Sequence, residues 1–401
     1  MNGKEYTVIS ETLIKGLFKE RARESHKGDY GKLVIVGGCK YYAGAPLLTE
    51  YGAAAVIDGM EKANREIAKY GTEGKNANCG TCELKKETTN GEINEYGAYV
   101  KNANRKIGEP ENGKRDAFGS CFLRERTGAN DENSGSESET ADALASDFLA
   151  DKIAANGVAA LRTGAGLNAL AVPDFLAAAI YGRVTASTVF PLSSSGGFID
   201  FRAEEFDGAF RRATAACIGM GIGMYEGLGR VVEYSLGIGI PTVYDADALN
   251  YIAENLDEFK GANKRGKAVV TPHYGEMSRL AKTDIQRIAE NPVLYAKNFA
   301  AEYGVVVLLK GADSMATDGR EVLINKTGSP CMAKGGSGDL LSGIIGGLLA
   351  QGNPPIISAA AGAFLAGRAA EKAEKIFTQY GVLPTDTAAL IPRVITEITV
   401  K

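Results

Sequence analysis

Short, continuous apolar runs alternate with longer stretches of helical pattern over most of the chain. The runs are KLVIVGG (32–38), CIGMGIG (217–223), PTVYDAD (241–247), KAVVTPH (267–273) and GVVVLLKG (304–311). Runs without alternation are typical of strands covered on both faces, and their β-branched residues and abrupt Gly, Asp or His ends favour strands over buried helix segments. We therefore predict a mainly parallel sheet with helices on each side, with functional groups at the carboxyl ends of its strands.

The apolar pattern breaks between residues 57 and 156. This stretch contains KYGTEGKNANCGTCELKKETTNGEINEYG and GANDENSGSESETADA, which are polar and poor in β-branched and aromatic residues. Such a segment buries too little apolar surface to offset its ordering entropy, and a long surface insertion costs little more to close than a short one. We expect one domain formed by 1–56 and 157–401, with 57–156 as an insertion of low order. A module that folds on binding a partner is the alternative.

Composition narrows the class of protein. The 401 residues are 45% apolar and 23% charged, which indicates a soluble, globular chain. The net charge of −4 gives no sign of the basic surface that nucleic-acid binding requires, so we expect no nucleic-acid partner. The start of the chain has no signal-peptide pattern, and the absence of a run of about 18 apolar residues predicts no membrane span, so we expect a cytoplasmic protein. The six scattered cysteines predict reduced thiols, and Cys79 and Cys82 alone do not make a zinc site.

The strongest chemical signal is KGGSGD, residues 334–339, followed directly by the apolar stretch LLSGIIGGLLAQG. Glycines allow a tight turn whose N–H groups point inward, and the start of a helix favours an anion, so the turn predicts a phosphate site. An aspartate beside phosphate has the wrong charge for binding, but Asp339 can accept a proton from an attacking hydroxyl. The alternative is an ordinary glycine turn in which Asp339 caps the helix.

Two further strand ends carry side chains suited to substrate or metal. His273 and Glu276 leave one strand end together, where an imidazole can bind substrate and a carboxylate can hold hydrated Mg²⁺. Asp245 and Asp247 follow another strand, and one of them can help to bind Mg²⁺. The alternatives are a satisfied loop histidine, a solvated glutamate and, for Asp247, a helix cap.

Three other segments offer binding groups. Lys310, at the start of Lys310-Gly311-Ala312-Asp313-Ser314, can steer nucleotide phosphates, although a lysine after a strand is commonly a solvated terminus. The turn 44–46 (GAP) and the glycines of 219–223 would let a ligand approach the backbone, and a close-packing turn is the alternative for both.

Taken in order, these segments resemble one known family. The Gly-x-Gly-Asp corner opening a helix resembles the ribokinase-like small-molecule kinases. The longer match, NKTGSPCMAKGGSGDLLSGIIGGLLAQG, is similar to ADP/ATP-dependent NAD(P)H-hydrate dehydratase. SHKGDYGKLVIVGG, YAGAPLL, ALRTGAGLNALAVP, GMGIG, VYDADALN, TPHYGEMSRL and VVVLLKGADS agree in the same order, over about 300 residues. Met220 and Cys331 stand where the family usually has proline and glycine.

The resemblance implies a ribokinase-like three-layer α/β/α sandwich with a mainly parallel sheet. It implies that Asp339 is the general base. It implies substrate binding by Ala45, Gly221, Gly223, His273 and Asp339. It implies nucleotide binding by Lys310, Gly311, Ala312, Asp313, Ser314, Gly336, Ser337 and Gly338. Glu276 and Asp245 would hold Mg²⁺, mainly through water.

The implied reaction repairs hydrated NADH and NADPH. ADP or ATP would phosphorylate the ring hydroxyl, and phosphate would then leave; both donors suit the same corner. The resemblance also implies a homo-oligomer, with a tetramer usual, that works with a separate epimerase, because only about 30 residues precede the first strand. The rival predictions are a ribokinase-like vitamin-precursor kinase, which would keep a phosphorylated product, and a non-catalytic nucleotide-binding protein inactivated by the insertion.

Overall fold

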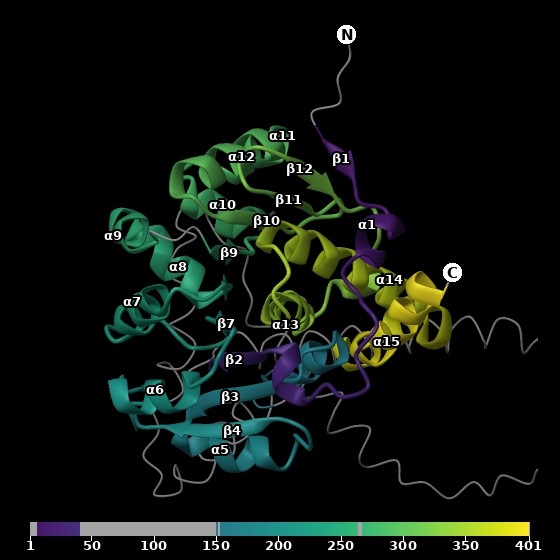
Figure 1. Ribbon diagram of the computed structural model, residues 1–401. Coiled ribbons are helices and arrows are strands. Elements are labelled where there is room, and N and C mark those ends of the chain that lie inside the picture. Colours follow the sequence, from purple (N-terminus) through teal and green to yellow (C-terminus); the bar gives the residue numbers. More distant parts are fainter. Residues whose placement is uncertain (1–5, 41–149, 151–152, 264–266, 401) are drawn as a thin grey trace, which may run out of the picture. The chain divides into compact units, whose positions relative to one another are not determined.

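The computed structural model describes residues 6–40, 150, 153–263 and 267–400, all of which belong to one compact unit (Figure 1). The turn that contains Ala45 lies outside the described residues, as do Cys79, Cys82, Cys121 and most of the predicted insertion. Residues 153–156, which the prediction placed at the end of the insertion, lie in a helix (153–162), and their side chains are buried. The other boundaries of the insertion stay predictions.

A ten-stranded sheet forms the middle layer of this unit. Its strand order is β1-β12-β11-β10-β9-β8-β7-β2-β3-β4, and every neighbouring pair is parallel except the two pairs made by β11. The strands are β1 (Thr7–Val8), β2 (Lys32–Val36), β3 (Leu167–Pro173), β4 (Thr188–Leu192), β7 (Ala215–Ile218), β8 (Thr242–Tyr244), β9 (Ala268–Val270), β10 (Val306–Leu309), β11 (Met315–Thr317) and β12 (Val322–Ile324). The mainly parallel sheet is confirmed, and each of the five apolar runs contains a strand.

Successive residues of a strand point to opposite faces of the sheet, and β2 shows why both faces are covered. Leu33 and Ile35 pack into one buried apolar cluster, and Val34 and Val36 pack into another. The first cluster also contains residues of the helices that cover this face, namely α1 (Glu11–Lys15), α5 (Asp174–Tyr181), α13 (Ser337–Ala350), α14 (Pro355–Gly381) and α15 (Pro384–Val400). The second cluster contains residues of the helices on the other face, namely α6 (Ala203–Phe210), α7 (Leu228–Ile238), α8 (Asp247–Glu254), α9 (Leu256–Ala262), α10 (Tyr274–Leu280), α11 (Ile285–Glu290) and α12 (Pro292–Tyr303). The three-layer sandwich is therefore confirmed.

Smaller elements complete the described part of the chain. They are the hairpin of β5 (Ser194–Ser195) and β6 (Phe198–Ile199), and the short 3₁₀ helices η1 (Lys27–Tyr30) and η2 (Pro330–Met332). Cys331, in η2, is a buried free thiol that contacts the carbonyl of Ala370, consistent with a substitution for packing. None of the helices in the described ranges combines the length and apolar character needed to cross a membrane.

Glycines set the position of α13 on the sheet. A Cβ at Gly346 would lie 2.5 Å from Cys217 Sγ of β7, and one at Gly343 would lie 2.3 Å from the Asn156 carbonyl oxygen. Both distances are shorter than any van der Waals contact, so only glycine lets the helix approach the strand and the 153–162 helix this closely. This packing holds the first turn of α13 over the carboxyl ends of β8 and β10.

Candidate active site

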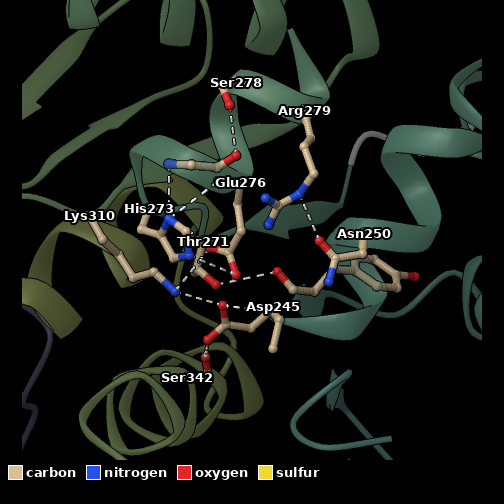
Figure 2. Close-up of polar contacts among 12 residues, drawn as sticks. Asp245, Asn250, Thr271, His273, Glu276, Ser278, Arg279, Lys310 and Ser342 are labelled. Atoms are coloured by element: carbon tan, nitrogen blue, oxygen red, sulfur yellow. Dashed lines mark hydrogen bonds and ion pairs between the residues drawn. The ribbon is translucent and has the colours of Figure 1, made fainter. Parts of the chain in front are cut away.

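Polar side chains from three neighbouring strand ends meet at one point (Figure 2). Lys310, directly after β10, directs its Nζ to within 2.7 Å of Asp245 Oδ1, at the end of β8. The same Nζ lies 3.6 Å from Glu276 Oε2, which follows β9 in the first turn of α10. The strand order β10-β9-β8 brings these three residues to one edge of the sheet, where function was predicted.

Asp245 is fixed by its own local structure. β8 ends at Tyr244, and the next peptide turns sharply, with Ala246 at φ 50° and ψ −117°. Asp245 Oδ1 accepts a hydrogen bond from the Ala246 N–H at 2.9 Å, and Oδ2 accepts one from the Ser342 hydroxyl of α13 at 2.8 Å. The residue is only 3% exposed. The carboxylate therefore ties β8 to α13 as well as to Lys310.

His273 and Glu276 form a reciprocal cap at the start of α10. The Glu276 Oε2 atom accepts from the His273 N–H at 2.7 Å, while His273 Nδ1 accepts from the N–H groups of Gly275 and Glu276 at 2.9 and 3.2 Å. Because Nδ1 is an acceptor, the proton of the neutral ring is on Nε2, which faces Glu276 Oε1 at 3.6 Å. This cap explains why His273 and Glu276 leave the strand end together.

Burial and charge act in opposite directions on the two basic groups here. Burial lowers the pKa of His273 below 6.5, and Lys310 and Arg279 add to this effect, while Glu276 and Asp245 oppose it. Burial would also lower the pKa of Lys310, but Asp245, Glu276 and Asp339 together raise it above 10.5. At neutral pH the imidazole is thus neutral and the lysine is charged.

The glycine turn and Asp339 reach the same place. Gly336, with φ 95°, precedes α13, which begins at Ser337. A Cβ built on Gly338 would lie 3.6 Å from Asp245 Oδ2 and 3.8 Å from Lys310 Nζ. Asp339 is in the first turn of α13 rather than at its cap, and it is near enough to raise the pKa of Lys310. The predicted phosphate turn, base and lysine therefore come together; their roles stay predictions.

Two residues to which the sequence analysis gave no role, Lys334 of the KGGSGD motif and Ser342, support this corner. Lys334 Nζ donates to the carbonyls of Tyr380 and Val382, at 2.5 and 2.6 Å, and so anchors the chain just before the glycine turn. Ser342 lies one turn beyond Asp339, fully buried. Its signal in the sequence is weak: a lone hydroxyl in the apolar stretch LLSGIIGGLLA, at helical spacing from the aspartate.

The stretch after Lys310 forms an exposed turn. The Ser314 hydroxyl donates to the Gly311 carbonyl at 3.1 Å, and Asp313 forms an ion pair with Lys326. Gly311, Ala312 and Asp313 are exposed. Nucleotide binding by this turn stays a prediction, but the alternative for Lys310, a solvated strand terminus, is wrong, because its side chain is only 20% exposed and is paired with a buried carboxylate.

The loop after β7 also joins the site. A Cβ at Gly219 would lie 2.0 Å from the Asp245 carbonyl oxygen, so no other residue fits there. The Gly223 N–H donates to Asp247 Oδ2 at 2.9 Å, which gives Asp247 a partner across the loop. Gly221 and Gly223 have φ of 65° and 81°, and Met220 is buried. Substrate binding by these two glycines stays a prediction, as it does for Ala45.

The described residues include no group of three or more His, Cys, Asp and Glu side chains that could hold a metal ion by themselves. Asp245 uses three of its lone-pair directions on Lys310, Ala246 and Ser342, and Glu276 uses Oε2 on the His273 N–H. Mg²⁺ typically keeps several waters and needs only one or two carboxylates beside substrate phosphates. These two carboxylates therefore fit Mg²⁺ held through water and phosphate, and they do not fit a site made of protein ligands alone.

The chain is similar in sequence to several named proteins. A sequence profile described as NAD(P)H-hydrate dehydratase matches residues 152–393. A bifunctional NAD(P)H-hydrate repair enzyme of Moorella thermoacetica is 34% identical over 252 residues, which is 62% of this chain and 47% of that protein. An ADP-dependent (S)-NAD(P)H-hydrate dehydratase of Cenarchaeum symbiosum is 34% identical over 242 residues, 60% of this chain and 82% of that protein. The chain thus spans about half the length of the bifunctional relatives.

Solved structures share the fold. A ribokinase-like superfamily protein of Enterococcus faecalis superposes with a TM-score of 0.62 at 18% identity, covering 99% of this chain and 98% of the other. The ADP/ATP-dependent NAD(P)H-hydrate dehydratase of Bacillus subtilis, co-crystallised with ATP/Mg²⁺, superposes with a TM-score of 0.60 at 18% identity, covering 99% and 100%. At these identities the superpositions establish the ribokinase-like fold and nothing finer.

Proposed function

Because the chain belongs to the NAD(P)H-hydrate dehydratase family, we propose that it dehydrates the hydrated forms of NADH and NADPH with ADP or ATP as phosphoryl donor. One observation carries the proposal: the glycine turn, Asp339 and Lys310 lie together over the carboxyl ends of β8 and β10. A phosphate cradle, a carboxylate and a cation are the groups that phosphoryl transfer requires.

The nucleotide would place its terminal phosphate on the N–H groups of Gly336, Ser337 and Gly338. These donors are fixed before the reaction, so they stabilise developing negative charge without reorganising. Lys310, whose Nζ lies 3.8 Å from a Cβ built on Gly338, would neutralise the phosphate. Glu276 and Asp245 would hold the water ligands of Mg²⁺, which would supply positive charge against that of the phosphates when bound.

Asp339 would accept the proton of the ring hydroxyl as the hydroxyl oxygen attacks phosphorus and the nucleotide leaves. The C–O bond then breaks, phosphate departs with the electron pair, and loss of a proton from the neighbouring ring carbon restores the double bond. Phosphate is a much better leaving group than hydroxide, and the ring nitrogen lone pair assists its departure. His273, neutral with its proton on Nε2, would donate a hydrogen bond to the substrate.

The test is turnover by Asp339→Asn on hydrated NADH, with Mg²⁺ and either nucleotide, followed by recovery of reduced-ring absorbance. We expect activity to fall by about 10²- to 10⁴-fold, the usual contribution of a general base, while ADP still raises the melting temperature. Asp318→Asn is the control, because Asp318 follows β11, which runs antiparallel to β10 and so ends at the opposite edge of the sheet.

Each rival function has its own signature in this assay. Undiminished turnover by Asp339→Asn would remove the residue from the role of base. Accumulation of a phosphorylated product without release of phosphate would favour a vitamin-precursor kinase. Stabilisation by ADP with no turnover in the unaltered chain would favour a non-catalytic nucleotide-binding protein. We also propose that residues 1–56 and the chain from residue 153 onward form one domain with a segment inserted after residue 56, since residues 153–156 lie in a buried helix of the folded part.

A further inference from the structure

We propose that the Lys310 ammonium occupies a site for a divalent cation, which lies between Asp245 and Glu276 and is here called the cation site. When a nucleotide binds, its phosphates would attract the ammonium out of this site. The metal would then enter only with the nucleotide. The inference rests on the proposed function, and it concerns the order in which ligands bind rather than the chemistry that follows.

The cation site consists of two carboxylates around one positive charge. Lys310 Nζ is 2.7 Å from Asp245 Oδ1 and 3.6 Å from Glu276 Oε2, and both carboxylates are less than a tenth exposed (Figure 2). Two buried carboxylates that share one ammonium carry a net negative charge. A divalent cation in the same position would neutralise both of them, whereas the lysine neutralises one.

The two carboxylates do not depend on the lysine for their orientation. Asp245 keeps the hydrogen bonds from Ser342 and from the Ala246 N–H when Lys310 is ignored, and Glu276 keeps the one from the His273 N–H. All three donors belong to helix starts or to the packed face of α13. Withdrawal of the ammonium would therefore leave the two carboxylates in place.

The side chain of Lys310 can leave the cation site by rotation about its own bonds. The residue follows the last residue of β10 on a flexible four-carbon side chain, and it retains 20% exposure. Its Nζ already lies 3.8 Å from the position of a Cβ on Gly338, at the predicted phosphate turn. A phosphate bound there would attract the ammonium without any change in the backbone.

Charge balance then couples the two ligands. Moving Lys310 toward a phosphate without replacement would leave two buried, unpaired carboxylates, which is strongly unfavourable because neither is solvated. Mg²⁺ that arrives with the phosphates removes this cost, since it accepts one or two carboxylates together with phosphate oxygens and water. Free Mg²⁺ in the absence of nucleotide must instead displace the lysine, and it gains no phosphate ligand in return.

Mn²⁺ serves as the probe, titrated into the full chain and followed by electron paramagnetic resonance. We expect the unaltered chain to bind Mn²⁺ at least tenfold more weakly without ADP than with it. Lys310→Met should bind Mn²⁺ without nucleotide at least tenfold more tightly than the unaltered chain does. Lys260→Met is the matched control, because it removes a lysine paired with an exposed glutamate, Glu302, away from the candidate site, and should change nothing.

A second variant covers the case in which Lys310→Met fails to fold. In the presence of ADP, Asp245→Asn should bind Mn²⁺ at least tenfold more weakly than the unaltered chain does. The proposal is overturned if the nucleotide-free, unaltered chain binds Mn²⁺ as tightly as the ADP complex, if folded Lys310→Met gains no affinity, or if Asp245→Asn leaves the affinity of the complex unchanged. No hydrated dinucleotide enters these titrations, so their failure is separable from failure of the Asp339→Asn test.

Discussion

Lys310 and Asp245 lie 65 positions apart in the chain, yet the lysine Nζ is 2.7 Å from the aspartate Oδ1. The contact closes a path of polar contacts that runs from Ser342 on α13 through Asp245 to Lys310. From there it continues to Glu276 on α10 and to His273, the N-cap of α10. One pair thus connects the elements that carry the candidate base, phosphate turn and histidine. Its removal should affect both stability and ligand binding.

Lys310→Met is expected to reduce the free energy of unfolding by roughly 3 kcal/mol, because it leaves Asp245 buried without its cation. Asp245→Asn in the same chain should restore part of this loss, since only one of the two carboxylates that shared the ammonium, that of Glu276, then remains charged. The chain has 17 tyrosines and no tryptophan, so urea unfolding is best followed by circular dichroism and tyrosine fluorescence. Additive effects of the two substitutions would contradict a direct pair.

Gly219→Ala should destabilise the protein far more than Gly196→Ala. Both glycines have positive φ, 115° and 60°, so each substitution carries backbone strain of about 1 kcal/mol or more. Only at Gly219 would the new Cβ meet backbone, 2.0 Å from the Asp245 carbonyl oxygen, whereas nothing lies within 4 Å of a Cβ at Gly196. Melting temperatures of the two variants compare them directly, and equal losses would mean that strain alone matters.

His273 should titrate below 6.5, because burial lowers its pKa and protonation would require Nδ1, the acceptor at the start of α10. The unfolded chain then binds the proton first, so stability falls as the pH drops below 6.5 and continues to fall until the folded pKa is passed. His273→Asn, which preserves a capping side chain, should show a smaller loss of melting temperature over that pH range.

The measurement is a proton NMR titration of the histidine ring signals. The chain has two histidines, and the signal absent from His273→Asn identifies residue 273. A midpoint for this signal at or above 6.5 would show that the neighbouring carboxylates outweigh burial.

Asp247→Ala should raise the KM for the hydrated dinucleotide, roughly tenfold, while stabilisation by ADP is unchanged. Asp247 Oδ2 accepts the Gly223 N–H at 2.9 Å, and losing a hydrogen bond to a charged group costs about 1.5 kcal/mol or more. The loop that carries the two predicted substrate glycines would then be less ordered. Asp257→Ala, on the exposed side of α9, is the control. An equal loss of ADP stabilisation would assign Asp247 to the nucleotide side instead.

Much of the sheet and the start of α13 could be predicted from the sequence. Continuous apolar runs identified β2, β7, β8, β9 and β10, because a strand buried on both faces has no polar alternation to confuse the pattern. The glycine turn was also predicted, since consecutive glycines before an apolar stretch allow the positive φ that Gly336 adopts before α13. β11 and β12, with three residues each, were not predicted: runs this short carry too little periodicity.

The sequence by itself therefore determined which segments are buried strands, where they end, and which residues are available at those ends. It did not determine which of those ends are neighbours. From local pattern Lys310 was as well described by a solvated terminus, and Ser342 by a core position. Only the strand order β10-β9-β8-β7 and the close packing of α13 against the sheet bring both residues into contact with Asp245. Contacts between residues this far apart arise from the packing of whole elements, which no local pattern encodes.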